Sequence, residues 1–306
     1  MQITDTILMI RPAAFGANEE TAVTNFFQTP ISEINTRSIQ QSALKEFDNM
    51  VDILRSHDIT VLVIDDTPTP LKPSAIFPNN WLTTSPEGIA SVFPMYAPNR
   101  RPEKRDDILK LLTDKFVVKD IQDWSEFEVE GKFLEGTGSM VIDHENKVIY
   151  TCYSPRTDIS ILEKFANANK YRAIAFLATD KNGYPVYHTN VVMTLGENFA
   201  VLCEEAIEEE WELIAIRQLL DSSGHDVIRI TKDQMHSFAG NMLQVKNAKG
   251  EKFLVMSQTA FDSLYDDQKE VLSSRANLLA IPIPVIEQTE GGSVRCMMAE
   301  IFLAKK

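Results

Sequence analysis

Cysteine is scarce in this sequence, which has only three in 306 residues, at positions 152, 203 and 296. Their number is odd and they lie far apart, which argues against a disulfide framework and fits a reducing compartment. No Cys-x-x-Cys pair is present, so a zinc finger or ribbon is not expected. We expect a cytoplasmic protein.

Long apolar runs and an excess of basic residues are also missing. No run approaches the roughly 20 apolar residues that a membrane helix needs, and MQITDTILMIRPAAFG lacks a basic segment before its short apolar run. The 44 acidic and 30 basic residues give a net charge of −14, which opposes binding to a phosphate backbone. Neither Gly-x-Gly-x-x-Gly nor Gly-x4-Gly-Lys-Ser/Thr occurs. These absences favour a soluble, unexported protein that binds a small molecule and neither nucleic acid nor membrane.

The segments that are present alternate between strand and helix patterns. Between expected strands at 5–10 and 59–64, the stretch 36–56 places Ile39, Ala43, Phe47, Met50 and Leu54 on one helical face. A helical pattern followed by a short apolar run recurs at 103–118, 157–178, 207–230 and 260–283. Such alternation is typical of an α/β fold.

Five segments repeat one plan, in which small or polar residues precede a hydrophobic strand. Aligning the starts of these strands superposes Asn80, Ser139, Asn190, Asn241 and Cys296, at intervals of 51 to 59 residues. A unit of that size cannot bury its own apolar face, so the repeat predicts a closed, pseudo-symmetric α/β propeller of five ββαβ-like units. Residues 1–306 would then form one catalytic domain. The simpler alternative is a twisted sheet whose asparagines lie in turns.

In a closed ring, Glu135, His188 and Cys296 would converge from three different units. A thiol needs a base, and a histidine needs a carboxylate to orient it. His188 stands two residues before Asn190, on the same face of an expected strand. The sequence therefore predicts a Cys/His/Glu site.

Cys296 differs from the two other cysteines in its neighbours. Cys152 and Cys203 lie in strongly apolar runs and are expected to be buried as small hydrophobic residues. Cys296 follows the Gly-Gly pair at 291–292 and stands beside Arg295, a source of positive potential that would favour a thiolate.

Three motifs carry a resemblance to a known superfamily: FLEG at 133–136, YHTN at 187–190 and GGSVRCM at 291–297. In this order and spacing they resemble the guanidine-modifying enzymes, which include arginine deiminases, dimethylarginine hydrolases, agmatine deiminases and amidinotransferases. RPAAFGAN at 11–18, FPNNW at 77–81 and FAGNMLQV at 238–245 are similar to the arginine-deiminase-related, citrulline-utilising hydrolases. The resemblance implies a five-bladed α/β propeller and neither a metal nor an organic cofactor.

The resemblance also implies roles for individual residues. Cys296 would attack the central carbon of a guanidino or ureido group, His188 would act as general acid and base, and Glu135 would orient His188 or hold a substrate nitrogen. SPRT at 154–157 resembles a segment whose arginine binds the substrate carboxylate, which points to Arg156. Ser139, from its aligned position, is a further expected substrate contact.

Asn80 and Asn190 depart from the deiminase pattern, in which aspartates hold the guanidinium. Amides offer neutral donors and acceptors, so the preference should shift towards a neutral ureido group. Citrulline, giving ornithine, ammonia and carbon dioxide, thus ranks first, and Asn241 is expected to join Asn80 and Asn190 in binding it. Succinylarginine dihydrolases have asparagine nearby and still accept a guanidinium, so arginine stays open. Amidino transfer, a catalytically silent arginine-binding module and a homodimer also stay open.

Overall fold

The computed structural model describes residues 1–25, 27–28 and 36–306, which form an α/β fold with five small mixed sheets. In each sheet the first strand is antiparallel to the second, and the second is parallel to the third. The strands, sheet by sheet, are β15 (Ala299–Glu300), β1 (Thr6–Arg11) and β2 (Thr60–Asp65); β3 (Leu82–Thr84), β4 (Ile89–Val92) and β5 (Asp120–Asp123); β6 (Met140–Asp143), β7 (Val148–Cys152) and β8 (Arg172–Phe176); β9 (Met193–Leu195), β10 (Phe199–Leu202) and β11 (Asp226–Arg229); β12 (Leu243–Lys246), β13 (Lys252–Ser257) and β14 (Asn277–Ile281).

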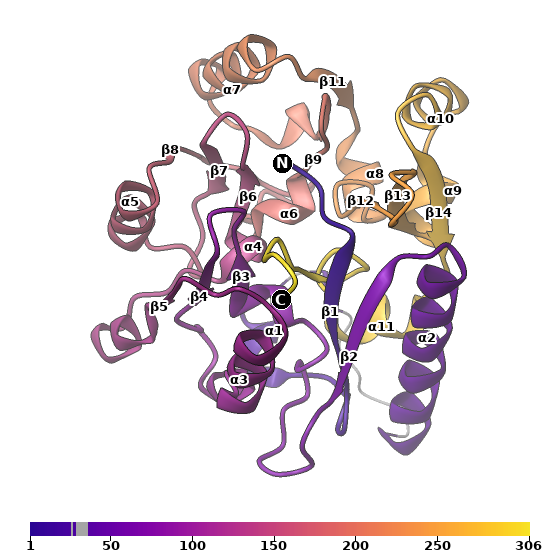
Figure 1. Ribbon diagram of the computed structural model, residues 1–306. Helices are drawn as coiled ribbons and strands as arrows, with labels where there is room; N and C mark the ends of the chain where they lie inside the picture. Colours follow the sequence, from indigo (N-terminus) through magenta and orange to yellow (C-terminus); the bar gives the residue numbers. More distant parts are fainter. Residues whose placement is uncertain (26, 29–35) are drawn as a thin grey trace.

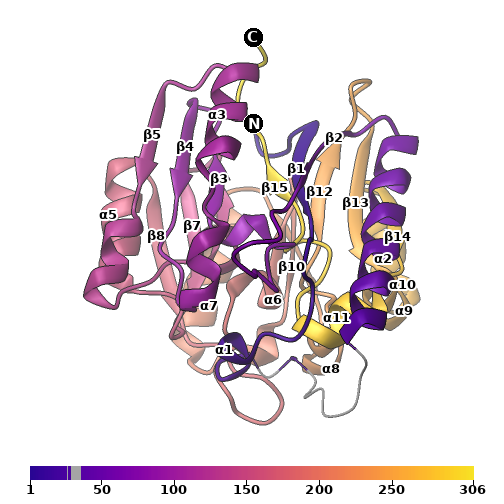
Figure 2. The ribbon, with the colours of Figure 1, turned by 90° about the horizontal axis from the view of Figure 1, so that it is seen from below.

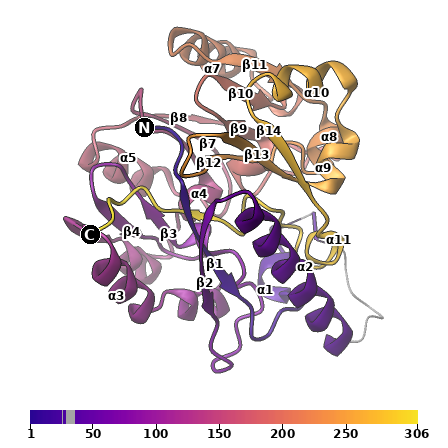
Figure 3. The same cartoon turned by 45° about the vertical axis from the view of Figure 1, so that its right-hand side comes forward.

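Helices connect the two parallel strands of each sheet, as parallel pairing requires. They are α2 (Thr36–Ser56), α3 (Asp106–Lys115), α5 (Ile159–Ala168), α7 (Glu210–Ser222) and the pair α9 (Gln258–Ser263) and α10 (Asp266–Ser273). Figure 1 shows α2, α3, α5, α7 and α10 at the periphery, and Figure 3 shows α2 beside β1 and β2. The helix–strand alternation predicted from the sequence is confirmed.

The packing of α2 follows from its apolar spacing. Ile39, Ala43, Phe47, Met50 and Leu54 are all buried, on the face that packs against β1 and β2. Burial of such side chains stabilises the fold by about 1.5–3 kcal/mol each. The predicted core face of this helix is confirmed.

Short helical turns precede the first strand of several sheets. They are the 3₁₀ turn Pro78–Asn80 before β3, α4 (Gly136–Ser139) before β6 and α6 (Thr189–Val192) before β9. The remaining short helices are α1 (Glu19–Ala22), α8 (Lys232–His236) and α11 (Pro284–Glu290), with 3₁₀ turns at Pro98–Glu103, Ser125–Glu130 and Glu204–Ala206. Asn80, Ser139 and Asn190, three of the five residues that the sequence alignment superposed, lie in the turns that precede β3, β6 and β9.

The sheet that contains β1 is assembled from both ends of the chain. β15 pairs with β1 through Ile7 opposite Glu300, and the Thr4 hydroxyl donates to the Ile301 carbonyl at 2.6 Å. Five sheets of one plan agree with the repeat, and the α/β class is confirmed. The five-fold symmetric arrangement of these sheets stays a prediction.

One local prediction was wrong. The apolar run Phe116–Val118 is not a strand; the third strand of that sheet is β5, which is polar and half or fully exposed. Phe116 instead bridges to Lys305 and is buried against the core. An edge strand that lies on the surface needs no apolar pattern, so hydrophobicity could not locate β5.

The two ends of the molecule differ in what they carry. Figure 2 shows both chain termini at one end, and α1, α8 and α11 at the other. None of the helices in the described ranges is both long and apolar enough to cross a membrane. The segments that close the candidate site belong to the end that carries α1 and α11.

Candidate active site

Cys296 lies in a tight turn that directly precedes β15. Its backbone N–H donates to the Ser293 carbonyl at 3.0 Å, and the residue is only 3% exposed. Two side-chain amides approach its Sγ, from Asn241 at 3.4 Å and from Asn190 at 3.6 Å. Asn241 also donates to the Asn190 carbonyl at 2.9 Å. The structure therefore brings three of the five aligned residues into contact.

Arg295 does not supply positive potential to this sulfur. Its guanidinium is directed away, to the Met298 carbonyl at 2.9 Å and to Glu300 at 2.8 Å. That sequence expectation was wrong, because consecutive residues of the turn face different cavities. Burial raises the pKa of Cys152 and of Cys203 to about 12, so these thiols stay protonated.

His188 and Glu135 form a buried hydrogen-bonded pair. His188 Nε2 lies 2.8 Å from Glu135 Oε2, and the two residues are 2% and 0% exposed. Burial opposes the charge on Glu135, but Arg156, followed by His188 and Arg100, outweighs it and lowers the carboxyl pKa to about 2. Burial also lowers the pKa of His188 to about 4, against the pull of Glu135. The empty site thus holds an anionic carboxylate and a neutral imidazole.

This pairing defines what the imidazole can do. A neutral ring that donates through Nε2 to a carboxylate carries its lone pair on Nδ1, so it can accept a proton there. His188 precedes the helical turn α6 and does not share a strand face with Asn190 as the sequence suggested. The role of His188 stays a prediction, while the strand expected around it was wrong.

The two glycines of α4 allow the site to be this compact. A Cβ on Gly136, whose φ is +43°, would lie 2.3 Å from the Asn79 carbonyl oxygen. A Cβ on Gly138 would lie 2.6 Å from Asn80 Nδ2 and 2.8 Å from His188 Nδ1. Any larger residue would displace these side chains. The sequence GTGS is therefore a packing element of the site.

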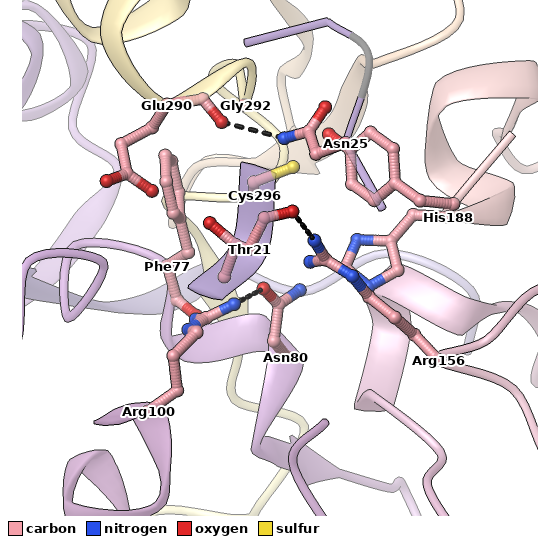
Figure 4. Close-up of a pocket in the computed structure, with 11 residues that line it drawn as sticks. Thr21, Asn25, Phe77, Asn80, Arg100, Arg156, His188, Glu290, Gly292 and Cys296 are labelled. Carbon is pink, nitrogen blue, oxygen red and sulfur yellow. Dashed lines mark hydrogen bonds between the residues drawn. The ribbon is translucent and has the colours of Figure 1, made fainter. Parts of the chain in front are cut away.

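A small cavity of about 20 Å³ joins these groups. Figure 4 shows Cys296 between Glu290 and Phe77 on one side and His188 and Arg156 on the other. The lining residues are Thr21, Asn25, Phe77, Asn80, Arg100, Arg156, Tyr187, His188, Glu290, Gly292 and Cys296. Such a volume holds little more than one water molecule, so an amino acid can enter only if part of the wall moves.

Part of the cavity wall comes from the segment 18–25, which we call the cover segment. Arg156 donates to the Thr21 carbonyl at 3.0 Å and to the Thr24 hydroxyl at 2.9 Å. The Asn25 amide donates to the Glu290 carbonyl at 2.8 Å. The cover segment is thus fastened to the site by a few polar contacts with residues more than 100 positions away in sequence.

Arg156 is at the centre of this fastening. Its Nη1 lies 3.4 Å from Glu135 Oε2, and its guanidinium stacks 4.8 Å above the Tyr187 ring. It therefore links Glu135 to the cover segment. Arg156, the predicted carboxylate-binding residue, does line the cavity. Its N–H groups donate to other residues of the protein.

Two charged residues of the cavity were missed by the sequence reasoning. Arg100 donates to Asn80 Oδ1 at 2.8 Å and pairs with Glu103 at 2.9 Å. Glu290 is the last residue of α11, and its carboxylate accepts from the Ser74 hydroxyl at 2.7 Å. The one signal for Glu290 was its place immediately before the Gly-Gly pair. Arg100 lies within NRRPEKR, where a cluster of charges hides which one is buried.

The predicted site residues differ in how they contact the cavity. Cys296, His188, Asn80 and Arg156 line the cavity, and Glu135 supports it through His188. Asn190 and Asn241 contact the sulfur. Ser139 accepts from the Glu135 N–H at 3.0 Å and donates to the Arg156 carbonyl at 2.9 Å, beneath the cavity. No group of His, Cys, Asp or Glu in the described ranges is placed to hold a metal ion.

Sequence comparison identifies the family of the chain. A profile described as N,N dimethylarginine dimethylhydrolase, eukaryotic, matches residues 11–303. The chain belongs to this family. The dimethylarginine dimethylhydrolase family is part of the guanidine-modifying superfamily that the three motifs indicated, so that assignment is confirmed. No curated protein sequence matches the chain significantly.

Solved structures share the fold of this family member at low identity. The N-terminal domain of ArgZ, an arginine dihydrolase from the ornithine-ammonia cycle in cyanobacteria, is 14% identical, with 96% of this chain and 97% of that chain covered and a TM-score of 0.72. Unliganded AgrE is 15% identical, with 96% of this chain and 39% of that chain covered and a TM-score of 0.74. A dimethylarginine dimethylaminohydrolase adduct with S-methyl-L-thiocitrulline is 12% identical, with 98% and 100% covered and a TM-score of 0.66.

Proposed function

We propose that the protein is a cysteine-dependent hydrolase of the terminal C–N bond of a ureido or guanidino amino acid, with citrulline as the first substrate. The observation that carries the proposal is the single cavity in which a thiol held by two amides meets a histidine paired with a carboxylate. The proposal includes five blades around one central site and residues 1–306 as one catalytic domain.

The reaction begins at Cys296. Its thiol transfers a proton to His188 and its sulfur attacks the ureido carbon, giving a tetrahedral adduct. His188 returns the proton to the leaving nitrogen, so that ammonia departs and a thiocarbamate remains on Cys296. Glu135 stabilises the imidazolium that forms during each transfer.

Water completes the cycle. His188 takes a proton from the water molecule, the resulting hydroxide adds to the thiocarbamate carbon, and Cys296 leaves as the thiol. The carbamate of ornithine is released and decays to ornithine and carbon dioxide. Burial keeps the imidazole neutral against the pull of Glu135, and the neutral ring is the form that both proton abstractions need.

The electrostatics around Asn80 favour the neutral ureido group. Asn80 Oδ1 already accepts from Arg100, so this edge of the cavity presents a cation next to the amide instead of the carboxylate that a guanidinium prefers. Arg100 and Asn80 together therefore weigh towards citrulline.

A guanidino substrate is the second candidate, and the family match favours it. The matched profile describes a hydrolase of dimethylarginine, and the ArgZ domain comes from an arginine dihydrolase. Arginine or a methylated arginine would react by the same steps, with loss of ammonia or of the methylated amine.

One screen decides between the candidates. Ammonia and amine release should be measured for citrulline, arginine, agmatine, methylated arginines and N-acylated arginines, with the Cys296→Ala variant as the blank. We expect citrulline to give the highest kcat/KM. Turnover of arginine or a methylarginine at least tenfold above citrulline would establish the second candidate, and no release from any compound would refute hydrolysis.

A further inference from the structure

Glu290 has a carboxylate oxygen that no described residue satisfies. The residue is 4% exposed and lines the same cavity as Cys296. Its Oε2 accepts the Ser74 hydroxyl at 2.7 Å, but its Oε1 has no hydrogen-bond partner in the described part of the chain. A buried polar atom left without a partner is unfavourable, and at a cavity wall it marks a place for a ligand.

The two arginines near Glu290 form their hydrogen bonds and ion pairs with other residues. Arg100 pairs with Glu103 and Asn80, and Arg156 contacts Glu135 and the cover segment. The cavity therefore contains a buried carboxyl group that forms no ion pair with any described residue.

Glu290 and Arg156 lie beneath the same cover segment. Asn25 bonds to the Glu290 carbonyl, and Thr21 and Thr24 bond to Arg156. In the view of Figure 4, Glu290 and Arg156 are on either side of Cys296. The reacting carbon of the substrate must lie within reach of Cys296 and His188. Glu290 and Arg156, which contact the cover segment, are then left to bind the α-amino and α-carboxylate end of the substrate.

We propose that Glu290 binds the α-ammonium group of the substrate, opposite Arg156 at the α-carboxylate, so that the enzyme takes a free α-amino acid and rejects an Nα-acylated one. This inference rests on the proposed function, because it names the substrate class of the same site. An acyl group would remove the positive charge and leave Oε1 of Glu290 without a partner.

Binding would then be coupled to a proton. Burial raises the pKa of Glu290 to about 8, against the Ser74 hydrogen bond and Arg100, with Glu103 adding to the rise and Arg156 opposing it. The empty site at pH 7 holds a neutral carboxyl group, and an incoming ammonium converts it to a carboxylate, with its proton released to solvent. Affinity for the free amino acid should therefore rise between pH 6 and pH 8.

The test compares citrulline with Nα-acetylcitrulline in the wild type and in Glu290→Gln. Gln keeps the shape and an acceptor for Ser74 but cannot take a charge. We expect the wild type to bind citrulline at least 100-fold more tightly than the acetylated compound. Glu290→Gln should raise KM for citrulline about 30-fold and change that for the acetylated compound less than threefold.

Glu287→Gln is the matched control. Glu287 lies on the same helix and is equally buried, but its oxygens accept from Ser293 at 2.6 Å and from Thr259 at 2.7 Å, and it does not line the cavity. The ratio between the two compounds should stay at the wild-type value in this variant.

Calorimetry in buffers of different ionisation enthalpy provides a readout that does not need turnover. In a Cys296→Ala background, which cannot hydrolyse the ligand, citrulline binding at pH 7 should release close to one proton, and the Cys296→Ala/Glu290→Gln double variant should release none. Equal loss of affinity for both compounds, an unchanged ratio or unchanged proton release would overturn the role of Glu290. Absence of ammonia release from every compound would refute the proposed function, while the binding measurements would still decide on Glu290.

Discussion

Arg295 and Cys296 are consecutive residues, yet their side chains enter two different buried polar clusters. Cys296 belongs to the thiol cluster, which we define as Cys296, His188, Glu135, Asn80 and Glu290. Arg295 belongs to the Arg295 cluster, which we define as Arg295, Glu300, Gln2 and His144. The two clusters line cavities of similar size, about 20 and 30 Å³, and each contains a buried histidine and a carboxylate, which is partly buried in Glu300.

The Arg295 cluster satisfies its polar groups within the protein. Arg295 pairs with Glu300 at 2.8 Å, and Gln2 donates to the Ile142 carbonyl at 2.9 Å. His144 donates its backbone N–H to Gln2 at 2.8 Å, and its Nδ1 lies 2.8 Å from the Tyr171 hydroxyl. The bonds of Gln2 connect the N-terminus to β6 and His144, and the Arg295–Glu300 pair connects the turn of Cys296 to β15, as expected of a structural cluster.

The thiol cluster leaves its polar groups incomplete. Oε1 of Glu290 has no hydrogen-bond partner among the described residues, although the residue is buried at the cavity wall. Burial and charge are therefore common to both clusters. The proposed binding site differs from the structural cluster because it contains a buried hydrogen-bonding atom for which the described residues provide no partner.

The largest effect should follow from Cys296→Ala. Removal of the nucleophile should lower ammonia release by a factor of about 10³ or more, because the covalent step has no substitute. Circular dichroism and thermal unfolding should show an intact fold. Cys152→Ala, which removes a buried thiol outside the cavity, is the control and should keep the wild-type kcat. Retention of a tenth of the activity in Cys296→Ala would contradict the assignment.

Much of the fold was accessible from the sequence. The repeat placed Asn80, Asn190 and Asn241 at the start of a strand, and each does precede the first strand of a sheet. The spacing of apolar residues predicted α2, because the buried face of a helix repeats every 3.6 residues. The surface strand β5 has no buried face, so the same criterion placed it at the wrong residues.

The site was predicted less completely, and the reason is three-dimensional. Cys296, His188 and Glu135 could be named because each stands at an equivalent end of a repeat. Arg100 and Glu290 have no equivalent in the other repeats, and only packing shows that they enter the cavity. The direction of Arg295 depends on one turn of backbone, which a sequence pattern does not specify.

Glu300→Gln should affect stability and not chemistry. The change leaves Arg295 buried without a counter-charge, which costs about 3 kcal/mol in the free energy of unfolding. Urea unfolding should show this loss, while KM and kcat of the folded enzyme should change less than twofold. A tenfold loss of activity with unchanged stability would show that the two clusters are not independent.

Asn80→Asp combined with Asn190→Asp should change substrate preference. Two carboxylates favour a cation, so kcat/KM for arginine relative to citrulline should rise about tenfold, or about 1.4 kcal/mol. The ratio cancels any effect on Cys296 that both substrates share. Asn80→Asp alone should give less, because Arg100 would neutralise much of the new charge. An unchanged ratio in the double variant would remove the ureido argument.

The smallest effect concerns acid stability, to which each cluster contributes one histidine. Burial lowers the pKa of His188 to about 4 and, with a smaller contribution from Lys147, that of His144 to about 3. Between pH 6.5 and pH 4 the unfolded chain therefore binds protons at these positions that the folded protein does not. Stability should rise with pH across that window, by up to about 1.4 kcal/mol per unit for each histidine.

Glu135 adds to this loss only at lower pH. Its folded pKa of about 2 lies below the unfolded value, so its contribution is present above about pH 4.5 and disappears as pH falls towards 2. Urea unfolding at pH 7, 6 and 5 gives the free energy of unfolding as a function of pH. The slope of this free energy against pH should be shallower for His144→Gln than for the wild type. His57→Gln, at an exposed position, should keep the wild-type slope. Equal slopes in all three proteins would mean that His144 is charged in the fold, because only a buried neutral histidine makes folding compete with protonation.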